Sequence, residues 1–168
     1  MSPLRVLMTV LWLACALQAG AAQPWQGTVT RVSDGDTLWV RPAAGGKPLK
    51  VRIDGIDAPE ICQDHGRAAR KALAARVLGR RLGVLARGQD DYGRTIAALA
   101  LDGEDVAGWL VSQGHAWSYG FGRDGGPYAR QQALAQAAAR GLFADRNALA
   151  PRLFRKRHGP CDPAAGRP

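Results

Sequence analysis

VRIDGIDAPE, residues 51–60, places three acidic side chains at intervals of three in a chain whose formal net charge is +9. These side chains are Asp54, Asp57 and Glu60. On a helix this spacing would stack them on one face, but Gly55 and Pro59 disfavour a helix by roughly 1 and 3 kcal/mol. The stretch therefore predicts a strand end followed by a loop crowded with carboxylates. Such crowding is unfavourable unless positive charge lies between them.

Strand-forming stretches lie on both sides of this loop. Five strands are expected, at 25–32, 37–40, 49–54, 82–87 and 94–101. The turn signal SDGD separates the first two, and the Gly- and Pro-containing loop 41–48 joins the second to the third. Three helices are expected from apolar spacing and helix-end residues, at 66–81, 104–114 and 127–141.

This order of elements predicts an α+β protein, a five-stranded OB-fold β-barrel with about three α-helices. No repeat or linker divides the chain, so residues 23–150 are expected to form one domain. Residues 151–168 are basic and Pro-rich, and we expect an extended C-terminal tail there.

Residues 1–22 are typical of an export signal. Arg5 precedes an apolar run that is too short to span a bilayer, and the small residues Ala21 and Ala22 follow it. We expect a cleaved signal peptide and a periplasmic or secreted monomer, without stable membrane insertion after cleavage. An uncleaved membrane anchor is the alternative. A pI near 10.3 favours an anionic partner, which charge alone does not identify among nucleic acid, acidic polysaccharide and membrane surfaces.

Two cysteines, Cys62 and Cys161, lie beyond this segment. Exported proteins usually oxidise such residues, which favours a disulfide. Each has a histidine three residues away, His65 and His158 respectively. A zinc site and two unpaired thiols therefore remain alternatives.

The acidic residues could form a metal site. Asp36 lies in DGDT at the start of the second expected strand, and Asp57 and Glu60 follow the third. If these strands pair antiparallel around the 41–48 loop, Asp36 and Asp57 lie near the same end of the hairpin. Converging carboxylate oxygens favour a hard cation such as Ca²⁺. The alternative is a solvated acidic loop whose acids pair with local arginines.

Two arginines make phosphate chemistry plausible. Arg52 alternates with the apolar residues of its strand, and Arg94 ends DDYGR at the start of the fifth. Two guanidinium groups beside a divalent cation match the charge of a phosphodiester transition state, because arginine binds phosphate bidentately. A nearby carboxylate can activate water. Taken singly, each arginine is better explained as a surface salt bridge.

DGDTLWV, VRIDGIDAPE, DYGR and the LV-x-QG-x-A of residues 110–116 resemble successive motifs of the staphylococcal nuclease (thermonuclease) family. They occur in the family's order with similar gaps, and the resemblance runs from about Trp25 to Leu142. It implies an OB barrel with three helices. It also implies Ca²⁺-dependent endonuclease activity that hydrolyses DNA and RNA phosphodiester bonds and leaves 3′-phosphates.

The resemblance also assigns roles to single residues. Asp36 and Asp57 match the metal-ligating aspartates, and Ala58 stands where the archetype has a threonine that ligates through its backbone carbonyl. The catalytic positions, a water-activating glutamate and two phosphate-binding arginines, correspond to Glu60, Arg52 and Arg94. Asp91 replaces a lysine of the archetype, which is expected to weaken phosphate contacts in that loop.

Aromatic residues that stack on the substrate are harder to place. Tyr119, Phe121 and Tyr128 are the candidates for substrate binding, with core or loop packing as the alternative. The main alternative function is a non-catalytic OB-fold module that binds nucleic acid through charge and stacking. The retained carboxylates argue against it, because simple binding needs no acids facing phosphates. We therefore expect an enzyme with DNA and RNA as its substrates.

Overall fold

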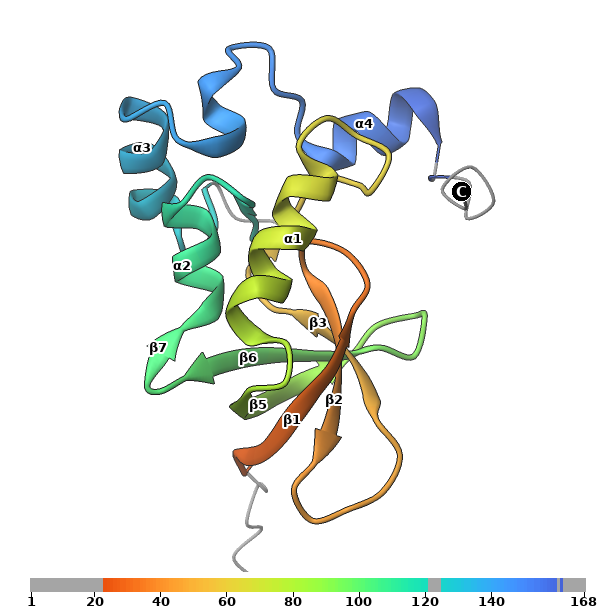
Figure 1. Cartoon of the computed structure of the whole chain (residues 1–168). Coiled ribbons are helices and arrows are strands. Elements are labelled where there is room, and N and C mark those ends of the chain that lie inside the picture. Colours follow the sequence, from red (N-terminus) through yellow and green to blue (C-terminus); the bar gives the residue numbers. More distant parts are fainter. Residues whose placement is uncertain (1–22, 121–124, 160, 162–168) are drawn as a thin grey trace, which may run out of the picture.

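The computed structural model describes residues 23–120, 125–159 and 161 (Figure 1). The strands are β1 (Trp25–Val32), β2 (Thr37–Pro42), β3 (Leu49–Ile53), β4 (Ile56–Asp57), β5 (Arg81–Gln89), β6 (Thr95–Leu101), β7 (Glu104–Asp105) and β8 (Trp117–Ser118). The helices are α1 (Gly66–Val77), α2 (Val106–Ser112), α3 (Ala129–Ala137), the 3-10 helix η1 (Gly141–Ala144) and α4 (Pro151–His158). Residues 1–22, where the signal peptide is expected, lie outside the described part of the chain.

The long strands close into a barrel. One sheet has the order β3-β2-β1-β5-β6-β7, and an additional parallel pairing between β3 and β6 joins its two sides. Register shifts in β1 between Val29 and Arg31, and in β5 between Ala86 and Gly88, increase the local twist that closure requires. The expected five-stranded OB-type α+β barrel is thus confirmed. The short β4 and β8 pair separately.

Alternate strand residues fill the barrel. Their side chains are fully buried, and they include Leu38, Val40, Val51, Ile53, Leu82 and Val84. Helix α1 covers the barrel with Leu73 and Val77, and α2 adds Leu110 and Val111 to the same core. Figure 1 shows these helices on one side of the strands. Within the described residues, no helix has the length and apolar character needed to cross a bilayer.

All three expected helices are shorter in the structure. Helix α1 stops at Val77 instead of residue 81, because Leu78 is extended and Gly79 adopts a left-handed φ of 74°. Residues 104–105 form β7, and Asp105 caps α2 by accepting a hydrogen bond from the Ala107 N–H.

The helix expected at 127–141 is also shorter in the structure. Helix α3 spans Ala129–Ala137, and the chain then turns into η1 after Ala139, whose φ is +48°. Gly141 packs against the Gly114 carbonyl, which a Cβ at Gly141 would approach to 2.3 Å, so only glycine fits this crossing.

The expectation of an extended tail is wrong for residues 151–158. They form α4, which makes four α-helices in the described residues where about three were expected. Pro151 occupies the first turn, where its missing N–H costs nothing, and Gly159 with a φ of 74° ends the helix. The polar character of the tail suggested solvation, but the helix is fixed by contacts distant in sequence.

Candidate active site

The β2–β3 hairpin brings the two expected metal-ligating aspartates together. Thr37 pairs with Arg52, so Asp36 lies beside the end of β3 that leads to Asp57. The Arg52 guanidinium contacts both carboxylates, through Nη1 at 3.4 Å from Asp36 Oδ2 and Nη2 at 3.1 Å from Asp57 Oδ1. Three residues from two segments therefore converge, as the antiparallel hairpin predicts.

Local packing fixes the Asp36 carboxylate. Its Oδ2 accepts a hydrogen bond from the Ala58 N–H at 3.0 Å, and its Oδ1 accepts one from the Thr37 hydroxyl at 2.9 Å. The preceding Gly35 is in close contact with Ala58 and α1. A Cβ at Gly35 would lie 2.7 Å from the Ala58 Cβ, which explains why glycine separates the acids of DGD.

The carboxylates are buried close to one another. Asp36 and Asp57 are only 7% and 4% exposed. Burial, and then the negative charge of Asp36, raise the pKa of Asp57 above its ordinary value. The same two causes raise the pKa of Asp34 to about 7. These acids repel one another, and a bound cation would reduce that repulsion.

The donor set fits a divalent cation. Within the described residues, no group of three or more His, Cys, Asp or Glu side chains forms a complete metal cage. Two buried carboxylates and nearby backbone carbonyls are hard oxygen donors, which suit a hard cation that keeps water or substrate oxygens in its remaining positions. Asp36 and Asp57 could supply carboxylate oxygens to such a cation, and Ala58 lines the same pocket.

The β5–β6 turn brings Arg94 to the same place. Parallel pairing sets Thr95 opposite Val51, so Arg94, the residue before Thr95, lies next to β3. Arg94 Nε lies 2.6 Å from Asp90 Oδ2, and its Nη1 lies 3.5 Å from the Thr37 hydroxyl. Its guanidinium also lies 5.5 Å from the centre of the exposed Tyr92 ring.

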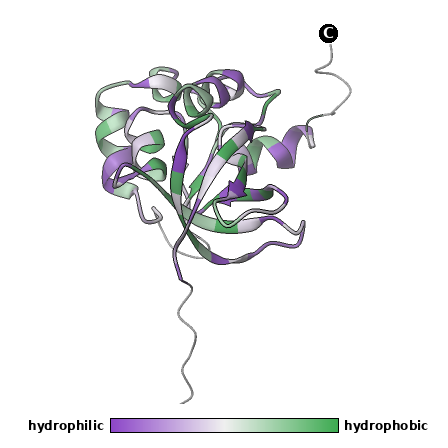
Figure 2. Cartoon of the chain, turned by 60° about the horizontal axis from the view of Figure 1, so that its bottom comes forward, coloured by the Kyte–Doolittle hydropathy of each residue, from purple (hydrophilic) through white to green (hydrophobic). Residues whose placement is uncertain are grey.

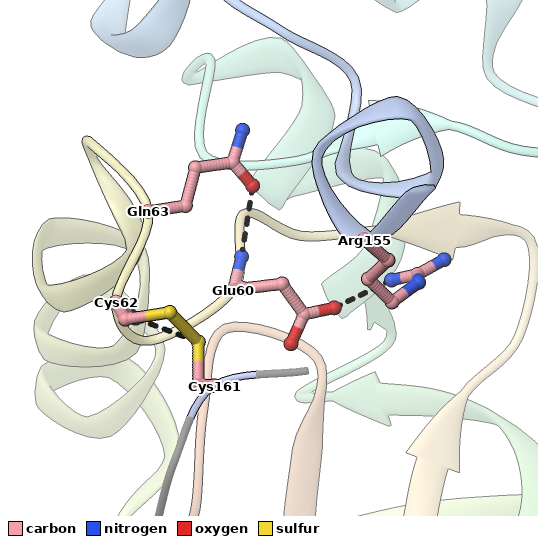
Figure 3. Close-up of a disulfide and its surroundings, with 5 residues drawn as sticks. All are labelled: Glu60, Cys62, Gln63, Arg155 and Cys161. Carbon is pink, nitrogen blue, oxygen red and sulfur yellow. Dashed lines mark hydrogen bonds and ion pairs between the residues drawn. A yellow bond between two sulfur atoms is a disulfide. The ribbon is translucent and has the colours of Figure 1, made fainter. Parts of the chain in front are cut away.

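Glu60 lies close to Asp57, because Arg155 of α4 contacts both carboxylates. Arg155 Nη1 donates to Glu60 Oε1 at 2.5 Å (Figure 3). Its Nη2 contacts Asp57 Oδ2 at 3.2 Å. The loop that carries Glu60 turns tightly against Gly66, where an added Cβ would lie 1.8 Å from the Glu60 carbonyl oxygen.

These side chains surround one pocket of about 440 Å³. It is lined by Asp34, Asp36, Lys50, Arg52, Asp57, Ala58, Pro59, Glu60, Tyr92, Arg94 and Arg155. Thus all six catalytic and metal-ligating candidates from the sequence meet there. Five further lining residues were not proposed as site residues from the sequence, namely Arg155, Tyr92, Asp34, Lys50 and Pro59. Tyr92 and Asp34 belong to the quoted motifs DYGR and DGD, which would have indicated them.

The two tyrosines expected to bind substrate have different positions, and Phe121 lies outside the described residues. Tyr119 lines a second pocket of about 890 Å³, which shares Arg52, Tyr92 and Arg94 with the first. Tyr128 is absent from the linings of both pockets, and its hydroxyl donates to Asp105 Oδ2 at 2.7 Å. Its partly buried ring packs against the core, which favours a structural role for Tyr128.

The two cysteines form a disulfide. Cys62 lies two residues after Glu60, and Cys161 follows α4 (Figure 3). The Cys62 N–H also donates to Cys161 Sγ at 3.1 Å. Of the alternatives considered from the sequence, the structure therefore contains the covalent link and not a zinc site.

Comparisons with known proteins agree with this fold. Residues 50–145 match the family model described as staphylococcal nuclease homologue. An uncharacterized endonuclease of Haemophilus influenzae is 34% identical over 153 residues, which cover 90% of this chain and 85% of that protein. A micrococcal nuclease of Shigella flexneri is 31% identical over 169 residues, covering 93% and 94% of the two chains.

An OB-type barrel with carboxylates and arginines around one pocket defines a phosphodiesterase of the nuclease class. The chain belongs to the staphylococcal nuclease family. It is therefore an enzyme, a nuclease with nucleic acid as its substrate, and the non-catalytic binding module is not supported.

Proposed function

We propose that this nuclease hydrolyses phosphodiester bonds in both DNA and RNA, depends on Ca²⁺ and leaves 3′-phosphates. One observation carries the proposal. The buried Asp36 and Asp57 share the guanidinium of Arg52 inside the pocket that also contains Glu60 and Arg94. The alternative, a solvated acidic loop whose acids pair with local arginines, agrees with these ion pairs but not with the burial of both carboxylates.

The arginines bind the phosphate. Arg52 and Arg94 approach the pocket from β3 and from the turn before β6, so they can contact different nonbridging oxygens of one phosphodiester. Their hydrogen bonds strengthen as negative charge develops on those oxygens during the reaction. This difference between ground state and transition state lowers the barrier.

Glu60 is proposed to act on water. Its carboxylate accepts a proton from a water molecule whose oxygen forms a bond to phosphorus. The bond between phosphorus and the 5′-oxygen breaks, and that oxygen takes a proton from solvent. The phosphate stays on the 3′-oxygen, so atoms and charges balance.

The carboxylates of Asp36 and Asp57 and the carbonyl of Ala58 would hold the cation. When bound, Ca²⁺ supplies positive charge that stabilises the phosphate oxygens and orients the substrate. Without a cation, Arg52 and Arg155 balance the charge of Asp57.

We also propose that the protein is exported to the periplasm or the medium as a monomer, after removal of residues 1–22. The support from the described residues is the disulfide between Cys62 and Cys161, because such bonds persist in oxidising compartments. Mass determination of the protein in periplasmic and medium fractions tests cleavage and location together.

The reaction is tested by incubating the purified protein with plasmid DNA and with RNA, in Ca²⁺ and in a chelator. We expect both substrates to be degraded only with Ca²⁺. The products should carry 5′-hydroxyls that a polynucleotide kinase labels directly, and 3′-ends that a polymerase extends only after phosphatase treatment. Degradation in the chelator, or products with 5′-phosphates, would contradict the proposal.

A further inference from the structure

Helix α4 is tied at both ends to the loop that carries Glu60. Before the helix, Gln63 Nε2 donates to the Leu149 carbonyl at 2.6 Å. After it, the disulfide joins Cys161 to Cys62. Gln63 also accepts a hydrogen bond from the Glu60 N–H at 3.1 Å (Figure 3). The helix is therefore fixed beside the active site, although the family match ends at residue 145.

The two sides of α4 have different surroundings. The ring centres of Phe154 and His158 are 4.7 Å apart, and both residues line a separate pocket of about 430 Å³ together with residues of the Glu60 loop and of η1. Arg155 lies in the active-site pocket between Asp57 and Glu60, and its side chain is still 41% exposed. Arg155 is therefore at the boundary between the packed side of the helix and solvent.

Helix α4 carries three more arginine or lysine side chains besides Arg155. At about 100° per residue, Arg152 and Lys156 lie within about 100° of Arg155 on one side of the helix, whereas Arg157 lies about 160° away. All three are exposed. Figure 2 shows that the helix preceding the chain end is coloured mostly as hydrophilic. We call Arg152, Arg155 and Lys156 the α4 cationic face.

We propose that the α4 cationic face binds the phosphates of the nucleic-acid strand that flank the scissile bond on the Glu60 side. The proposal rests on the proposed function of the site. A nucleic acid is favoured over an anionic membrane because the face is continuous with the pocket that contains Arg52 and Arg94. A nucleic-acid strand bound in that pocket could extend along the protein surface to α4.

The measurement is binding of a fluorescein-labelled single-stranded oligonucleotide by anisotropy, in a chelator to prevent cleavage, between 50 and 300 mM salt. Arg152→Gln and Lys156→Gln should each reduce the slope of log K against log salt by about 0.7, and weaken binding about fivefold at 0.1 M salt. The matched control is Arg157→Gln, which removes the same unit charge from the far side and should leave the slope unchanged.

Unchanged slopes in Arg152→Gln and Lys156→Gln would overturn the proposal. An equal loss in Arg157→Gln would also overturn it, because the effect would then reflect net charge. Loss of binding to vesicles of phosphatidylglycerol and phosphatidylcholine, with oligonucleotide binding intact, would assign the face to a membrane surface instead.

Removing the disulfide provides an independent test of the proposal. In Cys62→Ser/Cys161→Ser, α4 loses one of its two ties, and the slope should fall toward that of Arg152→Gln/Lys156→Gln. Far-UV circular dichroism verifies that the barrel is intact, and a wild-type slope in the folded variant would refute the anchoring. If the wild type degrades DNA while the helix variants bind like it, only this inference fails. If the wild type degrades no nucleic acid, the proposed function fails.

Discussion

The guanidinium of Arg155 lies 2.5 Å from Oε1 of Glu60, although 95 residues separate the two in sequence. The same guanidinium contacts both carboxylate oxygens of Asp57. Residues proposed for catalysis and for metal binding therefore have a direct partner in α4, beyond the segment that the family model matches. The C-terminal segment is thus part of the active-site wall in this nuclease.

Replacing Arg52 should affect both chemistry and folding. Arg52→Ala is expected to lower turnover by roughly 10²–10³-fold, because a donor to the developing charge is lost. It should also lower the melting temperature without calcium, because the buried Asp36 and Asp57 lose their shared partner. Steady-state kinetics and thermal unfolding measure the two effects. Arg41→Ala, which removes an exposed cation from β2, serves as the control.

Arg94→Ala should lower turnover by a similar roughly 10²–10³-fold, because Arg94 is the second phosphate donor. The cost in stability should be smaller than for Arg52→Ala, because Arg94 pairs with Asp90 in its own turn and not with the two buried aspartates. Near-normal turnover of the purified variant would contradict its assignment.

Calcium should raise the melting temperature. A ligand that binds only the folded state at 100 times its Kd adds about 2.7 kcal/mol to the free energy of unfolding. Asp36→Asn and Asp57→Asn should each remove most of this effect, since each deletes a charged ligand of the proposed site. Asp102→Asn, at an exposed position after β6, should retain it. Equal shifts in the two site variants and the wild type would place calcium elsewhere.

Gly66→Ala should damage the site without touching a functional side chain. The new Cβ would lie 1.8 Å from the Glu60 carbonyl oxygen, so the loop must move. We expect a loss of about 1–3 kcal/mol in the free energy of unfolding and a clear fall in turnover. Urea unfolding and kinetics measure both. Gly83→Ala is the comparison, because its Cβ would meet no atom closer than 3.9 Å.

The histidine pair predicts acid sensitivity. His65 Nε2 and His115 Nδ1 are 3.4 Å apart. Burial lowers the pKa of both, and the charge of His65 lowers the pKa of His115 further. The unfolded chain takes up protons near pH 6.5. The contribution of the pair to the free energy of unfolding is therefore fully present above pH 6.5. It is lost as the pH falls from there through the lower pKa values of the folded state.

His115→Gln should reduce this loss, so its melting temperature should fall less than that of the wild type between pH 7.5 and pH 5. Comparison with the wild type removes the contribution of the carboxylates, which titrate in both proteins. The same pH dependence in the two proteins would show that the pair does not control acid stability.

Much of the fold was predictable because its signals are local. Alternating apolar residues and the turns around 41–48 placed β2 and β3 nearly at their observed bounds, and the hairpin they form brought Asp36 and Asp57 together. The DYGR motif placed Arg94 at the start of β6. In each case the residues that specify the structure are close in sequence.

The features that the sequence analysis missed have different causes. Pro151 and Gly159 are helix-end signals that would have indicated α4, but the basic composition between them suggested a solvated tail. The position of Arg155 follows from its ion pairs with Asp57 and Glu60, which no local pattern encodes. The short β7 and the early end of α1 depend on the backbone conformation of one or two residues, which sequence patterns do not resolve.

The parallel pairing of β3 with β6 has a consequence for the cell that makes this enzyme. Arg52 and Arg94 come together only when Val51 lies opposite Thr95, which is the step that completes the barrel. A chain still emerging from the ribosome, before residues 95–101 are free, has no assembled pair of guanidinium groups. Catalysis that needs both arginines is therefore absent until β6 has been translated and has paired with β3.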